Sequence, residues 1–97
     1  MSDMDKAVRT AISGCWSQIK VTAGSIAEAS IASATASVKQ LISRIHMTSL
    51  FHVCGERATS LLSLDSNARP KALQAFMQGV YTKTLDTALE AGKDEHK

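Results

Sequence analysis

Residues 70–92 read PKALQAFMQGVYTKTLDTALEAG, and this stretch carries the clearest fold signal in the chain. Its large apolar residues recur mostly at steps of three to four, the spacing that brings side chains to one face of an α-helix. They are Leu73, Phe76, Met77, Val80, Leu85 and Leu89. Pro70 suits the first turn of a helix, where its missing N–H costs nothing. We therefore expect an amphipathic helix that begins at Pro70 and is closed by Gly92.

The same spacing appears near the start of the chain, over residues 4–19. Its apolar positions are Met4, Val8, Ala11, Ile12, Cys15, Trp16 and Ile19. Ser2 can cap this helix through its hydroxyl, and Gly14 is a weak point within it. Gly24 before Ser25 indicates a helix stop followed by a fresh N-cap.

Residues 26–47 continue the helical spacing, with Ala and Ser filling much of the first half. A flexible linker is the alternative for this low-complexity run, but the helix propensity of alanine favours a helix. Thr48 or Ser49 can then cap a third helix that Gly55 interrupts. Its expected buried face consists of Leu50, Phe51, Cys54, Ala58, Leu61 and Leu62. Because neither Gly nor Pro marks residues 47–49, the second and third helices could instead form one long bent helix.

These patterns predict an all-α protein, a small bundle of about four helices. With 97 residues the chain fits one domain, residues 1–97, in which residues 93–97 form a frayed tail. Hydrophobic residues make up 44% of the chain but aromatic residues only 4%, so Ala, Ile, Leu and Val must build most of the core. A core of such small side chains often gains stability by pairing with a partner.

The formal net charge is +2, and the basic residues are scattered singly from Lys6 to Lys97. This distribution gives little support for direct, sequence-specific binding of nucleic acid. No apolar run approaches the roughly 20 residues that span a bilayer. The opening MSDMDKAVRT also lacks the apolar core of a secretion signal. We expect no membrane contact and a cytoplasmic protein. Cys15 and Cys54 could pair in principle, but without a secretion signal two reduced, partly buried thiols are favoured.

The residues that could support chemistry are poorly spaced. His46, His52 and Cys54 stand six and two positions apart, whereas metal ligands on a helix usually stand three or four apart. A Cys–His nucleophile pair, oriented by Asp65 or Glu56, would need a thiol activated by a helix N-terminus or a basic pocket. Nothing in the sequence places Cys54 in such a setting. We expect no metal, no cofactor and no enzymatic activity.

Five residues are candidates for partner binding: Arg69, Pro70, Trp16, Phe76 and Tyr81. The three aromatic residues can serve either as core anchors or as contacts with a partner, and the core role is favoured for Trp16. The Arg69–Pro70 bond lies in a polar segment and could present a docking point to a cyclophilin-type prolyl isomerase. The expected extended conformation of the residue before proline would suit such a groove. A simple helix start at Pro70 is the favoured reading.

The opening MSDMDKAVRTAISGCW, the chain length, the helical character and the single proline, Pro70, resemble the small anti-RecBCD proteins of lambda-like Salmonella phages. The resemblance covers the whole chain. It implies a phage-encoded protein that acts in the host cytoplasm on the RecBCD helicase–nuclease through its RecC subunit. Such a protein would inhibit or modify RecBCD, protect phage DNA and favour phage recombination, with no need for catalysis of its own.

Two alternatives remain open at this level. The Ala- and Ser-rich stripe over residues 23–37 would suit a self-assembling helical adaptor or structural protein. The mild positive charge and the helix–loop–helix pattern over residues 49–71 would suit a small nucleic-acid-binding regulator. A stable homo-oligomer would favour the first, and steep salt dependence of duplex binding would favour the second.

Overall fold

The computed structural model describes residues 2–33, 42 and 44–95. This part of the chain contains four α-helices, one short 3-10 helix and no strand. The elements are α1 (Asp3–Gly14), α2 (Trp16–Ser33), α4 (Arg44–Arg57), the 3-10 helix η1 (Thr59–Ser63) and α5 (Arg69–Glu95). The all-α class and the expected number of about four helices are confirmed.

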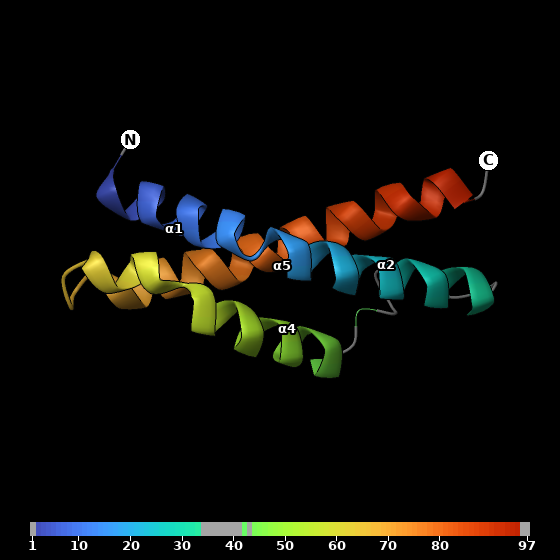
Figure 1. The fold of residues 1–97 in the computed structure, drawn as a ribbon, viewed down its shortest axis with the longest axis horizontal. Coiled ribbons are helices and arrows are strands. Elements are labelled where there is room, and N and C mark those ends of the chain that lie inside the picture. Colours follow the sequence, from blue (N-terminus) through green and yellow to red (C-terminus); the bar gives the residue numbers. More distant parts are fainter. Residues whose placement is uncertain (1, 34–41, 43, 96–97) are drawn as a thin grey trace.

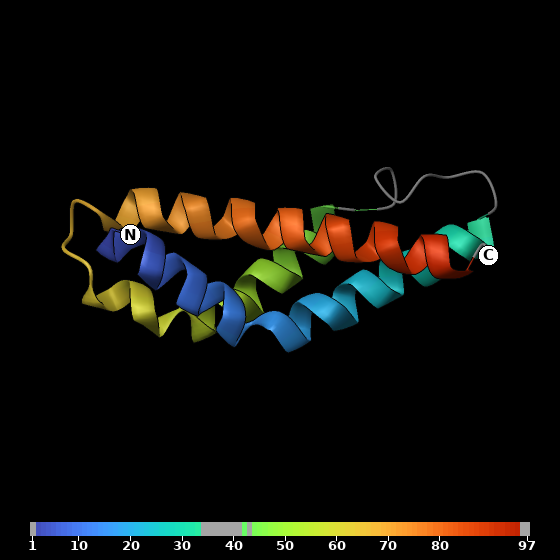
Figure 2. The same cartoon turned by 90° about the horizontal axis from the view of Figure 1, so that it is seen from above.

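The molecule is elongated, with principal extents of 47 × 24 × 17 Å, and α5 runs along its length (Figure 1, Figure 2). Helices α1 and α2 follow one another along α5 and point in the same direction as α5. Helix α4 runs the opposite way and leads through η1 back to the beginning of α5. Helix α5 is therefore the frame against which α1 and α2 pack in turn.

Two groups of buried side chains hold the helices together. The larger group joins α1, the start of α2, α4, η1 and the first half of α5, and contains Ala7, Val8, Ala11, Cys15, Ile19, Met47, Leu50, Cys54, Ala58, Leu61, Leu64, Ala72, Phe76 and Val80. The smaller group joins the later parts of α2 and α5 and contains Ala23, Ile26 and Ala88. Burying one large side chain such as Phe76 or Ile19 contributes roughly 1.5–3 kcal/mol. The small side chains of Ala23 and Ala88 in the second group let α2 and α5 approach closely.

The break in the first helical segment lies at Cys15, which separates α1 from α2 with φ −107° and ψ 6°. The predicted stop at Gly24 and cap at Ser25 are wrong, because α2 continues through both. Ala23 and Ile26 on either side of Gly24 are buried, so packing against α5 outweighs the low helix propensity of glycine. The cap at the chain start is confirmed: Ser2 Oγ accepts a hydrogen bond from the Asp5 N–H at 3.2 Å.

The boundary predicted at residues 47–49 is also wrong, since α4 begins at Arg44 and runs through it. Met47 and Leu50 are buried in the larger core group, which keeps this segment helical. Ile42 is not helical, so the chain forms neither a continuous helix over residues 26–47 nor one long bent helix from the second and third predicted helices. Residues 34–41, in which part of the predicted helix over 26–47 falls, lie outside the described residues.

Helix α5 includes Pro70 as its second residue, so the predicted helix start is confirmed. The helix does not close at Gly92 but continues to Glu95. Leu62, predicted to be buried, lies on η1 and is exposed. No helix in the described part of the chain is long and apolar enough to cross a membrane.

Candidate functional site

An open apolar hollow of about 420 Å³ lies where the end of α4, η1 and the start of α5 meet. We call it the Pro70 hollow; it is lined by Gly55, Ala58, Leu61, Leu62, Arg69, Pro70 and Leu73. Leu62 is 67% exposed and Leu73 about half exposed. Contiguous exposed apolar surface, rather than a single exposed leucine, is the feature that marks sites of contact with another protein.

A polar turn fixes the two sides of this hollow relative to each other. Asp65 Oδ1 accepts hydrogen bonds from the Asn67 and Ala68 N–H groups, both at 2.9 Å. Arg69 Nε donates to the Leu64 carbonyl oxygen at 2.9 Å, and its Nη2 donates to the Leu62 carbonyl oxygen at 3.2 Å. Arg69 therefore ties the end of η1 to the first turn of α5. In the sequence, Asp65-Ser66-Asn67 indicates this turn, because an Asp side chain commonly accepts hydrogen bonds from backbone N–H groups two or three residues later.

Pro70 is exposed in the first turn of α5. Arg69 is itself the first residue of α5, so the expectation that the residue before proline is extended is wrong. Entry of the Arg69–Pro70 bond into an extended groove would require this turn to unwind. It would also break the two hydrogen bonds from the Arg69 side chain.

Trp16 does not anchor the core, contrary to the favoured prediction. It begins α2 and is 38% exposed. The ammonium nitrogens of Lys20 and Lys83 lie 5.8 Å and 5.7 Å from its ring centroid. Each such cation–π contact at an exposed site contributes about 0.5–1 kcal/mol. Because Lys83 belongs to α5, Trp16 helps to hold the start of α2 against that helix.

The other two aromatic candidates separate into different environments. Phe76 lies in the larger core group and is buried, so a partner cannot reach its ring in this structure. Tyr81 is exposed on the same helix. Among the five predicted partner residues, only Arg69 and Pro70 are brought together in one hollow.

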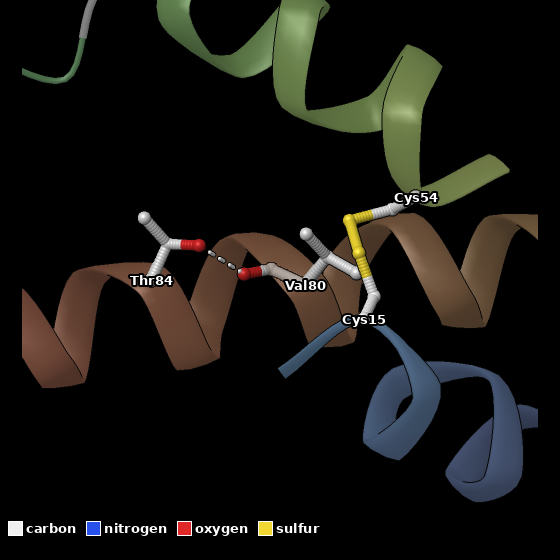
Figure 3. Close-up of a disulfide and its surroundings, with 4 residues drawn as sticks. All are labelled: Cys15, Cys54, Val80 and Thr84. Carbon is white, nitrogen blue, oxygen red and sulfur yellow. Dashed lines mark hydrogen bonds between the residues drawn. A yellow bond between two sulfur atoms is a disulfide. The ribbon is translucent and has the colours of Figure 1, made fainter. Parts of the chain in front are cut away.

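Cys15 and Cys54 form a disulfide, so the prediction of two reduced thiols is wrong (Figure 3). Their Cα atoms are 5.4 Å apart, within the usual range for this bond, and both residues are completely buried. The bond joins the break between α1 and α2 to the last turn of α4, beside Val80 of α5. One helical turn beyond Val80, the buried Thr84 donates its hydroxyl to the Val80 carbonyl oxygen at 2.7 Å. The pairing depends on a tertiary approach between residues 39 positions apart, which local spacing does not reveal.

His46, His52 and Cys54, considered from the sequence as metal ligands or as a nucleophile pair, do not form such a site in the described residues. His52 Nε2 lies 3.3 Å from Glu56 Oε1 on an exposed face of α4. Cys54 is in the disulfide and has no thiol to act as a ligand or a nucleophile. Across residues 2–33, 42 and 44–95, no three His, Cys, Asp or Glu side chains gather in a way that could hold a metal ion.

A search of known proteins found no matching family model, no matching curated protein and no matching solved structure.

Proposed function

We propose that this chain is a phage-encoded, non-catalytic protein that binds the host RecBCD helicase–nuclease through RecC. Binding would inhibit or modify RecBCD, protect phage DNA and favour phage recombination. The identity of the partner rests on the resemblance carried by the opening sixteen residues, the chain length and Pro70. The manner of binding rests on the surface of the folded chain.

The Pro70 hollow is the structural observation that supports docking of a protein partner. It is apolar, it is open, and two leucines with large exposed areas line it. The hydrogen bonds of Asp65 and Arg69 hold its backbone in place before any partner arrives. A surface that is already ordered loses less conformational entropy on binding, which favours affinity. An apolar side chain of RecC that enters the hollow would bury Leu62 and Leu73 together.

The test is a two-component binding assay between purified RecBCD and the purified chain, followed by a nuclease assay on linear duplex DNA. We expect saturable binding, an altered nuclease response of RecBCD, and no nuclease activity from the chain alone. If RecBCD shows no binding to the folded chain, the proposal is wrong and the adaptor alternative becomes the better explanation.

A second partner is proposed at the same place, a host prolyl isomerase of the cyclophilin type. Its support is the exposure of Pro70 on the hollow. Because Arg69 is helical and hydrogen-bonded, this contact would have to unwind the first turn of α5. Binding of the isomerase should therefore be weaker than binding to an unstructured Arg–Pro peptide.

The self-assembly alternative loses part of its motivation. Ala23 and Ala27, in the small-residue stripe that suggested it, are buried within the chain itself. Ala23 packs in the same group as Ala88 of α5. These positions are therefore already used inside one molecule, and no observation on the described residues favours a second copy as their partner.

A further inference from the structure

The disulfide and the Pro70 hollow are adjacent in the chain. Cys54 is followed directly by Gly55, and the segment that starts there supplies Ala58, Leu61 and Leu62 to the hollow. We call residues 55–62 the hollow wall. The opposite side of the hollow comes from α5, which carries Arg69, Pro70 and Leu73. The covalent bond to Cys15 thus fixes the chain at the point where the wall begins.

The other restraints on the wall beyond α4 are a few hydrogen bonds. Past the end of α4 the backbone bonds run over three residues: Ala58 N–H to Gly55 O at 3.2 Å, Leu61 N–H to Ala58 O at 3.1 Å, and Leu64 N–H to Leu61 O at 3.3 Å. Such 3-10 bonds have poorer geometry than those of an α-helix. Ser60 Oγ donates to the Ala7 carbonyl oxygen at 2.9 Å, and Arg69 holds the far end through Leu62 and Leu64. The end next to Cys54 is held by the last turn of α4, by the disulfide and by packing.

We propose that the Cys15–Cys54 disulfide is a redox-controlled clasp that regulates the Pro70 hollow. With the bond intact, the hollow wall is held in the shape that receives the partner. With both cysteines as thiols, the wall becomes mobile and the partner binds less tightly. The identity of that partner rests on the proposed function, whereas the mobility of the wall does not.

The conversion balances with a dithiol as the reductant. The dithiol supplies two electrons and two protons: its own sulfurs join in a disulfide, the Cys15–Cys54 bond breaks, and each cysteine sulfur gains a hydrogen. Attack requires a thiolate to reach one of the two sulfurs. Because both residues are completely buried, α4 must first move away from the α1–α2 break. The redox state is therefore set during folding or local opening, and the two forms can be prepared separately.

The test compares the full chain in two forms, one oxidised and one refolded in excess dithiothreitol, by backbone ¹⁵N relaxation. In the oxidised form we expect order parameters of about 0.85 for the hollow wall, as in rigid backbone. In the reduced form those values should fall below about 0.6, while residues 76–84 of α5 keep theirs. Unchanged order parameters in the wall would overturn the clasp.

A crosslink-free variant, Cys15→Ala/Cys54→Val, keeps an apolar interior and serves as the control. It should resemble the reduced form in both buffers, and it replaces that form if the dithiol chain does not fold. If neither folds, the bond is a purely structural requirement and the clasp is wrong.

A loss of about tenfold in RecBCD affinity on reduction is also expected, from the added cost of ordering the wall. A redox-dependent wall without any RecBCD binding would refute the proposed function but leave the clasp standing.

Discussion

Phe76 and Met77 are neighbours on α5 in opposite environments, with 1% and 38% of each side chain exposed. We predict that Phe76→Ala lowers the free energy of unfolding by about 3–5 kcal/mol, because it leaves a cavity in the larger core group. Met77→Ala should cost about 1 kcal/mol or less. Urea denaturation of the two variants measures the difference. Equal losses would mean that the ring of Phe76 is not in the core.

Pro70 offers a second test at a single residue. Pro70→Ala should lower the free energy of unfolding by less than about 1 kcal/mol, since alanine is also accepted in a first helical turn. Binding to a cyclophilin-type isomerase, measured by calorimetric titration, should disappear. Lys71→Ala is the control, because it changes the next exposed residue and keeps the proline. If wild type and Pro70→Ala bind alike, or if neither binds, Pro70 is not a docking point for the isomerase.

For single residues, the sequence predicts the structural environment of some side chains correctly and of others wrongly, for identifiable reasons. Pro70 was correctly placed because its ring restricts the backbone wherever it occurs. The predicted core position of Trp16 is wrong. Trp16 stands beside Cys15 at the edge of the apolar stripe, where a step of one residue moves a side chain from the core to the surface. The predicted burial of Leu62 is wrong because α4 ends and the 3-10 helix η1 follows it. The 3-10 geometry changes which side chains after residue 58 point to the core and which to solvent.

Among the helices, α2 gives the clearest test of a corrected boundary. Apart from its chain neighbours and the backbone of its own helix, a Cβ on Gly24 would meet no atom within 4 Å, and α2 continues through this residue. We predict that Gly24→Ala raises the free energy of unfolding by about 0.5–1 kcal/mol, through its higher helix propensity and the reduced freedom of the unfolded chain. A shift of the denaturation midpoint at constant slope measures this gain.

Gly79 on α5 is the matched control for Gly24. A Cβ there would come within 2.5 Å of Ile12 Cδ1, so the Ile12 side chain must move. We expect the stabilisation by Gly79→Ala to be smaller than that by Gly24→Ala, or to be reversed. A loss of stability in Gly24→Ala would show that α2 does end near residue 24, as the sequence pattern had suggested.

The break at Cys15 shows why element boundaries were harder to predict than element type. Ala11, Cys15 and Ile19 are all buried and stand four residues apart, so the apolar stripe passes through the break without a change of phase. The sequence therefore predicts one helix where the structure has two. The distinguishing contact is with Cys54, which is 39 residues away. Local spacing contains no information about it.

For the whole molecule, the disulfide should contribute to stability as well as to the shape of the hollow. It closes a loop with a sequence separation of 39. The loss of chain entropy in the unfolded state predicts a stabilisation of about 4 kcal/mol for a loop of this length. We expect guanidinium denaturation to give a clearly lower midpoint for the reduced chain. Coincident curves for the oxidised and reduced chains would contradict this contribution.

The overall architecture was the most predictable level, because four amphipathic or alanine-rich segments in a chain of 97 residues have few ways to bury their apolar faces. The hollow was not predictable, since it forms where three elements meet around the turn at Asp65. The sequence indicates only its Arg69 and Pro70 side. The proposed function therefore requires that this assembled surface bind the proposed partner.

The most direct test of that claim is the affinity of RecBCD for two variants with matched exposure. Leu62 in the Pro70 hollow and Val21 on α2 are each 67% exposed, and Val21 does not line the hollow. Leu62→Ser should weaken binding on the order of tenfold or more, as expected for a central apolar contact, while Val21→Ser leaves it unchanged. Equal affinities for the two variants, or no binding of RecBCD by the wild-type chain, would contradict the account.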